Sequence, residues 1–134
     1  LVVPLQCAFV DLTSQQCGYL HFDRYECDLM EWMRRQTAKP EEIMLVCRII
    51  FTMVQAVVWI HSQDVVHGDI KPSNFLWDSS KSLPRLHDFE TAKEGGALTP
   101  RARSTTAPAL HTWRYAAPEL KGDPSCRKSR ATDV

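Results

Sequence analysis

The sequence carries no net charge, because its 16 Lys and Arg residues are balanced by 16 Asp and Glu residues. No overall electrostatic field therefore favours binding to a nucleic acid or to an acidic membrane surface, and we expect neither as a partner. The chain also contains no internal repeat and no low-complexity tract. Partners must therefore be inferred from individual sites.

The cysteines show no paired spacing. The chain has an odd number of them, and no two are separated by only two residues: Cys7, Cys17, Cys27, Cys47 and Cys126. This pattern disfavours both a disulfide framework and a zinc knuckle. It favours a reducing, intracellular setting, and we expect the cytoplasm.

No segment has the pattern of a targeting signal or a membrane anchor. Residues 1–10 lack a basic leader and contain Pro4 and Gln6, which favours a buried strand over a signal peptide. Residues 43–60 are long and apolar, but Arg48, Thr52 and Gln55 interrupt them on one helical face. We expect the core helix of a soluble protein.

The pattern of apolar residues predicts mixed helices and strands. Strands are predicted at residues 5–11 and 19–22, and a short helix begins after Asp28. A longer helix begins at Pro40, and its core-facing positions are Val46, Ile49, Ile50, Met53, Val57 and Ile60. Residues 75–77 and 84–87 predict a hairpin, and residues 91–111 have the composition of a mobile loop.

Residues 67–74, His-Gly-Asp-Ile-Lys-Pro-Ser-Asn, combine groups that suit phosphate chemistry. Asp69 can orient or deprotonate a hydroxyl, and Lys71 can neutralise a phosphoryl oxygen. Asn74 can bind a metal ion through its amide oxygen. These three residues are therefore the first candidates for a catalytic site.

The sequence resembles a eukaryotic-type serine/threonine protein kinase domain. Residues 67–74 are similar to the family's His-Arg-Asp catalytic loop, residues 88–90 (Asp-Phe-Glu) to Asp-Phe-Gly, and residues 117–119 are Ala-Pro-Glu. Asp88 follows Asp69 by 19 residues, and Glu119 follows Asp88 by 31. Each motif alone is weak, but the order and spacing of all three are specific.

The resemblance implies the cofactors ATP and Mg²⁺ and a protein substrate. Asp69 would orient the substrate hydroxyl, Lys71 would contact the transferred phosphoryl group, and Asn74 with Asp88 would hold Mg²⁺. Lys71, Thr112 and Tyr115 together are similar to serine/threonine rather than tyrosine kinases. Glu119 would form a structural ion pair with a basic residue outside this chain, and Asp133 would brace the catalytic loop.

The resemblance also implies a hinge that binds adenine. Phe22 would be the gatekeeper, and backbone groups of Asp23 and Tyr25 would face the base. Leu76 would form the floor of the adenine site. Asp28, near the end of the hinge, would be a further ATP-binding residue.

The implied fold is α+β, a partial two-lobed kinase fold within residues 1–134. Residues 1–27 would form the end of the small β lobe and the hinge, and residues 28–134 the first half of the mainly helical large lobe. The Gly-rich phosphate loop and its partner Lys would lie before Leu1. We therefore expect this piece alone to be neither stable nor active. The pattern leaves the oligomeric state open.

Two departures from the family pattern keep other functions open. Gly68 stands where regulated kinases have Arg, which disfavours control by loop phosphorylation at Ser104, Thr105, Thr106 or Thr112. Glu90 replaces Gly and adds a carboxylate near the expected metal site. The alternatives are a catalytically silent kinase-like binding module and a small-molecule phosphotransferase similar to aminoglycoside and choline kinases.

Simpler structural roles compete with the catalytic ones. We interpret His67 as a buried packing residue rather than a base, and Phe89 as a core residue. A zinc site of His61, His67 and His87 lacks ligand spacing on one element. The basic run at residues 127–130 is interpreted as a solvated face.

Overall fold

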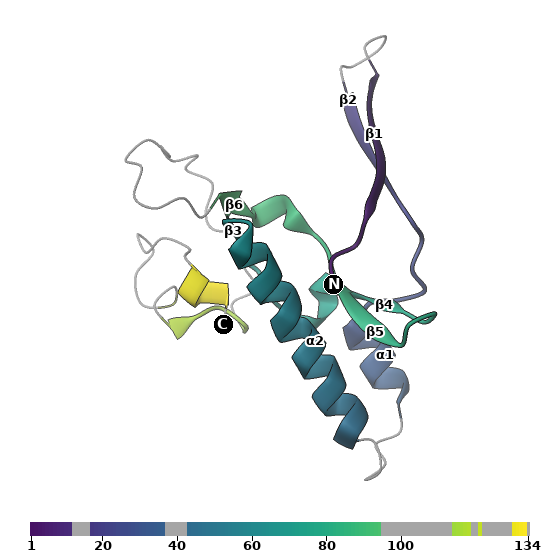
Figure 1. The fold of residues 1–134 in the computed structure, drawn as a ribbon, viewed down its shortest axis with the longest axis vertical. Helices are drawn as coiled ribbons and strands as arrows, with labels where there is room; N and C mark the ends of the chain where they lie inside the picture. Colours follow the sequence, from purple (N-terminus) through teal and green to yellow (C-terminus); the bar gives the residue numbers. More distant parts are fainter. Residues whose placement is uncertain (12–16, 37–42, 95–113, 119–120, 122–129, 134) are drawn as a thin grey trace.

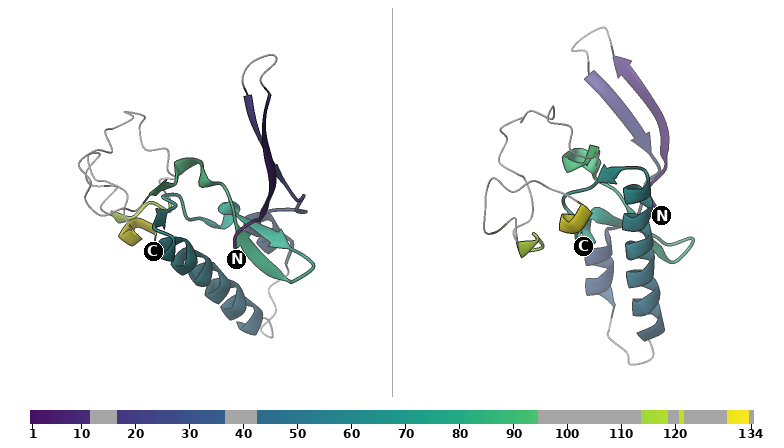
Figure 2. Two further views of the ribbon diagram at one scale, coloured as in Figure 1. Left: turned by 45° about the horizontal axis from the view of Figure 1, so that its top comes forward. Right: turned by 60° about the vertical axis from the view of Figure 1, so that its left-hand side comes forward.

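The computed structural model describes residues 1–11, 17–36, 43–94, 114–118, 121 and 130–133. Two α-helices lie side by side in Figures 1 and 2, and one end of this pair carries short strands and the catalytic loop. The described strands form three two-stranded sheets, β1 with β2, β3 with β6, and β4 with β5. All three pairs are antiparallel.

The first hairpin stands out from the rest of the molecule (Figures 1 and 2). Strand β1 (Leu5–Asp11) pairs with β2 (Cys17–Phe22), and the rings of Phe9 and Tyr19 stack across it at 5.1 Å. Val3 is buried, but Leu5 and Phe9 are about half exposed. The prediction of a buried strand over residues 1–10 is therefore wrong beyond its start, because no other described strand covers this hairpin.

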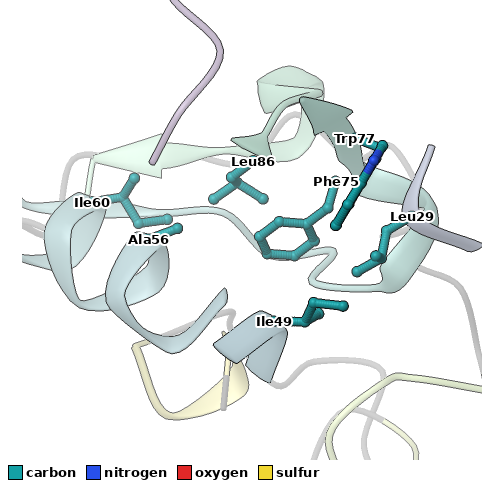
Figure 3. Packing of buried hydrophobic residues seen from close by; sticks show 7 residues of the cluster. All are labelled: Leu29, Ile49, Ala56, Ile60, Phe75, Trp77 and Leu86. Atoms are coloured by element: carbon teal, nitrogen blue, oxygen red, sulfur yellow. The ribbon is translucent and has the colours of Figure 1, made fainter. Parts of the chain in front are cut away.

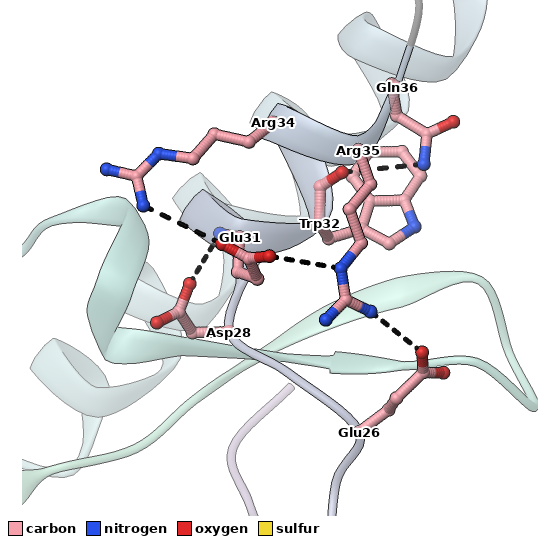
Figure 4. A network of polar contacts seen from close by, with 7 residues as sticks. All are labelled: Glu26, Asp28, Glu31, Trp32, Arg34, Arg35 and Gln36. Atoms are coloured by element: carbon pink, nitrogen blue, oxygen red, sulfur yellow. Dashed lines mark hydrogen bonds and ion pairs between the residues drawn. The ribbon is translucent and has the colours of Figure 1, made fainter.

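Helix α1 (Leu29–Arg35) begins as predicted. The carboxylate of Asp28 caps it, with Oδ1 accepting the backbone N–H of Glu31 at 2.7 Å. Glu31 also pairs with Arg35, and Figure 4 shows Arg35 reaching back to Glu26. Such exposed pairs contribute little to stability, so the cap and the buried Leu29 define the helix.

Helix α2 (Ile43–Ser62) packs against β5. Ile49, Val57 and Ile60 are buried as predicted, but Val46 and Ile50 are half exposed and Thr52 is buried. The predicted face was therefore wrong in part. Apolar residues surround much of this helix, so several faces fit the spacing equally well. The Thr52 hydroxyl donates to the carbonyl of Arg48 at 2.8 Å, which satisfies it inside the core.

Length and composition alone would allow α2 to cross a membrane, and no other helix in the described ranges has this property. The core helix of a soluble protein meets the same criteria. The start predicted at Pro40 lies outside the described residues, as do the acidic residues after it.

The predicted second hairpin is confirmed and carries the core. Strand β4 (Phe75–Asp78) pairs with β5 (Leu83–Leu86). Phe75 lies at the centre of a cluster drawn in Figure 3, and its seven members are Leu29, Ile49, Ala56, Ile60, Phe75, Trp77 and Leu86. Trp32 of α1 stacks on Trp77 with ring centroids 3.9 Å apart. This packing fixes the strand that directly follows the catalytic loop.

The segment after β5 is more ordered than its composition predicted. A 3₁₀ turn, η3 (Phe89–Thr91), precedes strand β6 (Lys93–Glu94), which pairs with β3 (Val65–Val66). The loop predicted at residues 91–111 is therefore wrong for its first four residues. Pairing with β3 supplies the ordering that composition does not reveal. Residues 95–111 lie outside the described ranges.

Candidate active site

Asp133 anchors the start of the catalytic loop. It lies at the end of the 3₁₀ turn η4 (Arg130–Asp133) and is buried. Its Oδ2 accepts the backbone N–H of His67 at 2.7 Å, and its Oδ1 accepts that of Gly68 at 2.6 Å. The imidazole of His61 lies 3.0 Å from Oδ2. The bracing contact implied by the sequence is therefore present, and His61 adds to it.

Gly68 has φ of 79°, a left-handed conformation that penalises any residue with a Cβ atom. The residue is buried, and its N–H is one of the two bonded to Asp133. The backbone conformation alone therefore favours glycine at this position. This reason is independent of the loss of the Arg side chain.

Asp69, Lys71 and Asn74, the three candidates of the catalytic loop, contact one another in the structure. The Lys71 Nζ donates to Asp69 Oδ2 at 2.5 Å, and both side chains are mostly buried. Asn74 ends the 3₁₀ turn η2 (Pro72–Asn74) and is 4% exposed. Its Nδ2 donates to the carbonyl of Asp69 at 2.8 Å and to Asp69 Oδ2 at 3.2 Å. One carboxylate is thus held by a cation and an amide.

His67 packs inside the loop and is fully buried. Its Nε2 donates to the carbonyl of His87 at 2.9 Å. Burial lowers the pKa of the imidazole, and this hydrogen bond and nearby carboxylates oppose the shift only partly. The lowered pKa favours the neutral ring, which agrees with a packing role.

Phe89 meets the edge of the His67 ring, with centroids 4.9 Å apart and an interplanar angle of 61°. Its side chain is nevertheless 37% exposed, so its assignment to the core is wrong. The hydrophobic cluster ends at Leu86, before the chain turns outward.

Asp88 directly follows His87, whose backbone is hydrogen-bonded to the catalytic loop. The backbone N–H of His87 donates to the carbonyl of Asn74 at 3.0 Å. Asp88 itself is exposed and has φ of 62° and ψ of 68°. Its carboxylate makes no capping bond to the turn that follows.

The donor atoms of Asn74 and Asp88 fit magnesium, which prefers oxygen ligands. Because Nδ2 of Asn74 is committed to Asp69, the amide oxygen is the atom suited to a cation. In the described part of the chain, no three His, Cys, Asp or Glu side chains gather as a metal cluster. The rings of the three histidines considered for zinc bind different groups. His61 contacts the Asp133 carboxylate, and the rings of His67 and His87 contact the backbone carbonyls of His87 and Ser73.

The hinge segment lies beside β4. The N–H of Trp77 donates to the carbonyl of Cys27 at 2.9 Å, and Asp28 forms an isolated bridge with Leu76. The structure therefore places Leu76 beside Asp28 at the end of the hinge. The Asp28 carboxylate itself caps α1.

A groove of about 570 Å³ lies between the hinge and the second hairpin. It is lined by Asp23 and Tyr25 on one side and by Trp77 and Arg85 on the other. Burial raises the pKa of Tyr25. None of Asp69, Lys71, Asn74 and Asp88 lines this groove, so it is separate from the phosphate-binding candidates.

The predicted substrate-side residues are only partly described. Tyr115 lies in a turn and is 40% exposed. Thr112 and Glu119 lie outside the described residues, as do Ser104, Thr105 and Thr106.

Two polar residues of the site were not assigned a role from the sequence. His61 contacts Asp133, and Thr91 donates its hydroxyl to the carbonyl of His67 at 2.8 Å. Thr91 is 24 positions from His67. No local pattern signals a contact over that separation.

A loop held by a buried Asp, followed by a hairpin and a second Asp, is the arrangement that the motifs of a protein kinase domain imply. The protein kinase domain model matches residues 2–134, so the chain belongs to the protein kinase domain family. The α+β partial kinase fold implied by the motifs is thereby confirmed.

Among curated proteins, the chain is similar to cyclin-dependent kinase B1-1 of Arabidopsis thaliana, with 31% identity over 106 residues. The match covers 76% of this chain and 33% of the relative. The chain therefore spans about a third of the length of the curated relative it matches.

Proposed function

We propose that the full-length protein is an ATP- and Mg²⁺-dependent protein kinase that phosphorylates Ser or Thr hydroxyls of a protein substrate. The observation that carries the proposal is the contact of Asp69 with both Lys71 and Asn74. Phosphoryl transfer needs a held nucleophile and positioned positive charge more than covalent chemistry. This cluster supplies, within one braced loop, a carboxylate to hold the substrate hydroxyl and a positive charge beside it.

Asp69 would accept a hydrogen bond from the substrate hydroxyl and orient it toward the phosphorus atom. Lys71 would balance the Asp69 carboxylate and approach an oxygen of the transferred phosphoryl group. Asn74 fixes the Asp69 backbone through its amide nitrogen. The loop therefore presents its carboxylate in one orientation.

Asn74 and Asp88 would hold Mg²⁺ through oxygen atoms. The bound ion would neutralise charge on the phosphates of ATP. The chain places the two residues on segments joined by the bond from His87 to Asn74. Backbone groups of Asp23 and Tyr25 would bind adenine, with Leu76 below the base and Asp28 closing the hinge.

Specificity for Ser and Thr rests on Lys71 together with Thr112 and Tyr115 before the Ala-Pro-Glu motif. Glu119 would make a structural ion pair. The match to the protein kinase domain model supports a protein rather than a small molecule as acceptor. Similarity to a cyclin-dependent kinase supports an intracellular role.

The test compares full-length wild-type protein with Asp69→Asn in transfer of radiolabelled phosphate from ATP to a protein substrate. We expect Asp69→Asn to lower kcat by at least about 100-fold, because the positioned carboxylate is lost. Asp64→Asn is the matched control. Asp64 is an exposed Asp that pairs with Arg130, and we expect that variant to keep its activity.

Phosphoamino-acid analysis of the product should find phosphoserine or phosphothreonine. Equal transfer by wild type and Asp69→Asn would contradict the assignment of Asp69. ATP binding without transfer by the wild type would identify a catalytically silent binding module instead.

A further inference from the structure

Asp88 occupies an uncommon backbone conformation. Its φ of 62° and ψ of 68° lie in the left-handed region, which is costly for most residues with a Cβ and less so for Asp. Such a conformation persists when the surrounding structure holds it in place. The contacts on either side of Asp88 are therefore informative.

The side before Asp88 is held by two hydrogen bonds of the His87 backbone. Its N–H donates to the carbonyl of Asn74 at 3.0 Å. Its carbonyl accepts from Nε2 of His67 at 2.9 Å. This side is thereby tied to both ends of the catalytic loop.

Side-chain packing after Asp88 is limited, because Phe89 is more than a third exposed and Glu90 is exposed. The Phe89 ring meets the edge of the His67 ring, and further along the chain β6 pairs with β3. The turn closes on itself through the bond from the Ala92 N–H to the carbonyl of Phe89. The side-chain tie from this turn to the catalytic loop is the 2.8 Å bond from Thr91 Oγ1 to the carbonyl of His67.

Each side of Asp88 has a hydrogen bond to His67, and the backbone N–H of His67 is itself bound by Asp133. The ring of His67 binds the side before Asp88, and its carbonyl binds the side after it. The segment that carries Asp88 is therefore fixed to the same frame as Asp69. Loss of the Thr91 hydroxyl would remove the side-chain contact on the later side and leave the pairing of β6 with β3 to hold that side.

We propose that Thr91 is a positioning residue, whose hydroxyl holds the segment carrying Asp88 in register with the catalytic loop and so sets the affinity for Mg²⁺. The proposal rests on the proposed function for the identity of the metal site. Thr91 acts through the backbone and does not itself contact substrate or metal.

The first test measures amide hydrogen exchange of residues 88–94 in the full-length protein. Thr91→Val has the same shape without the hydroxyl, and Thr91→Ser keeps the hydroxyl. We expect Val to speed exchange of this segment roughly three- to tenfold, the usual effect of one net hydrogen bond. Thr91→Ser and amides of the β4–β5 hairpin should stay within about twofold of wild type.

The second test titrates Mg²⁺ in the phosphate-transfer assay. We expect Thr91→Val to raise the Mg²⁺ concentration for half-maximal activity roughly three- to tenfold, with Thr91→Ser near wild type. The KM for ATP at saturating Mg²⁺ should change little, because the hinge lies elsewhere.

Unchanged exchange in Thr91→Val, or equal acceleration in both variants, would overturn the proposal. Faster exchange with an unchanged Mg²⁺ titration would also overturn it, since Thr91 would then be merely structural. If the wild type transfers no phosphate, the proposed kinase function fails. The metal readout is then binding of Mn²⁺, followed by its electron spin resonance signal, with the same order of variants expected.

Discussion

Gly68 shows how a single backbone angle constrains the catalytic loop. With φ of 79° in a buried position, Gly68→Ala would place a Cβ in the left-handed region. We expect this substitution to lower the free energy of unfolding of the full-length protein by about 1 to 2 kcal/mol. Urea denaturation would measure the change.

Gly18 provides the matched control for that substitution. It lies in β2, and a Cβ added there meets no atom within 4 Å. Gly18→Ala should leave stability unchanged or slightly increased, since Ala loses less conformational entropy on folding. Equal effects of the two substitutions would show that the conformation of Gly68 is not restrictive.

Individual residues also show what the sequence could predict of the site. Asp69, Lys71 and Asn74 lie within six positions, so the sequence alone was enough to select them together as candidates. His61 and Thr91 reach the loop from an adjacent helix and a later turn. Their roles depend on tertiary packing, which spacing along the chain does not encode.

At the scale of elements, the β4–β5 hairpin is stabilised by one carboxylate. Asp78 accepts from the Ser80 hydroxyl at 2.5 Å and from Arg85 at 2.6 Å. The Ser80 hydrogen bond, followed by that of Arg85, lowers the pKa of Asp78 from 3.8 to about 2. The turn between the strands therefore favours the ionised carboxylate.

We expect Asp78→Asn to lower the free energy of unfolding by about 1 to 2 kcal/mol at neutral pH, because bonds to a charged acceptor are lost. The pKa of Asp78 is lower in the folded than in the unfolded state. Its contribution is therefore fully present above pH 3.8 and is lost as pH falls toward 2.

Urea unfolding of the full-length protein across this pH range would measure the contribution. The wild type should lose more stability than Asp78→Asn between pH 4 and 2. Ser80→Ala should show part of the effect, since it removes the largest cause of the shift. Parallel pH profiles for all three proteins would contradict this role.

Elements differ in how well the sequence predicted them. The cap at Asp28 and the turn between β4 and β5 are local signals, and both were predicted correctly. The buried face of α2 was not, because apolar residues such as Val46 and Ile50 fit a core position by spacing and yet lie exposed. A helix with apolar residues around most of its surface needs its neighbours to define its inner face.

At the scale of the whole molecule, large apolar surfaces remain uncovered. The exposed residues on α2 include Met44, Phe51, Val54, Val58 and Trp59, and the first hairpin adds Phe9 and Leu20. Surfaces of this kind mark interfaces or cause aggregation. We therefore predict that residues 1–134 alone self-associate and lack a cooperative thermal transition.

Size-exclusion chromatography with light scattering would test that prediction, alongside a thermal melt. The full-length protein is the control and should be monodisperse with a cooperative melt, because further chain would cover these surfaces. A monomeric 134-residue chain with a sharp transition would contradict the prediction.

The anchor at Asp133 also bears on when the catalytic loop is formed. Asp133 is 66 positions after His67, whereas the hairpin that follows the loop is built from neighbouring residues. Contacts over such separations form late, since a long loop must close first. During synthesis on the ribosome, the helices and second hairpin would emerge before the residue that fixes the loop. The nascent chain would thus acquire its core before its catalytic geometry.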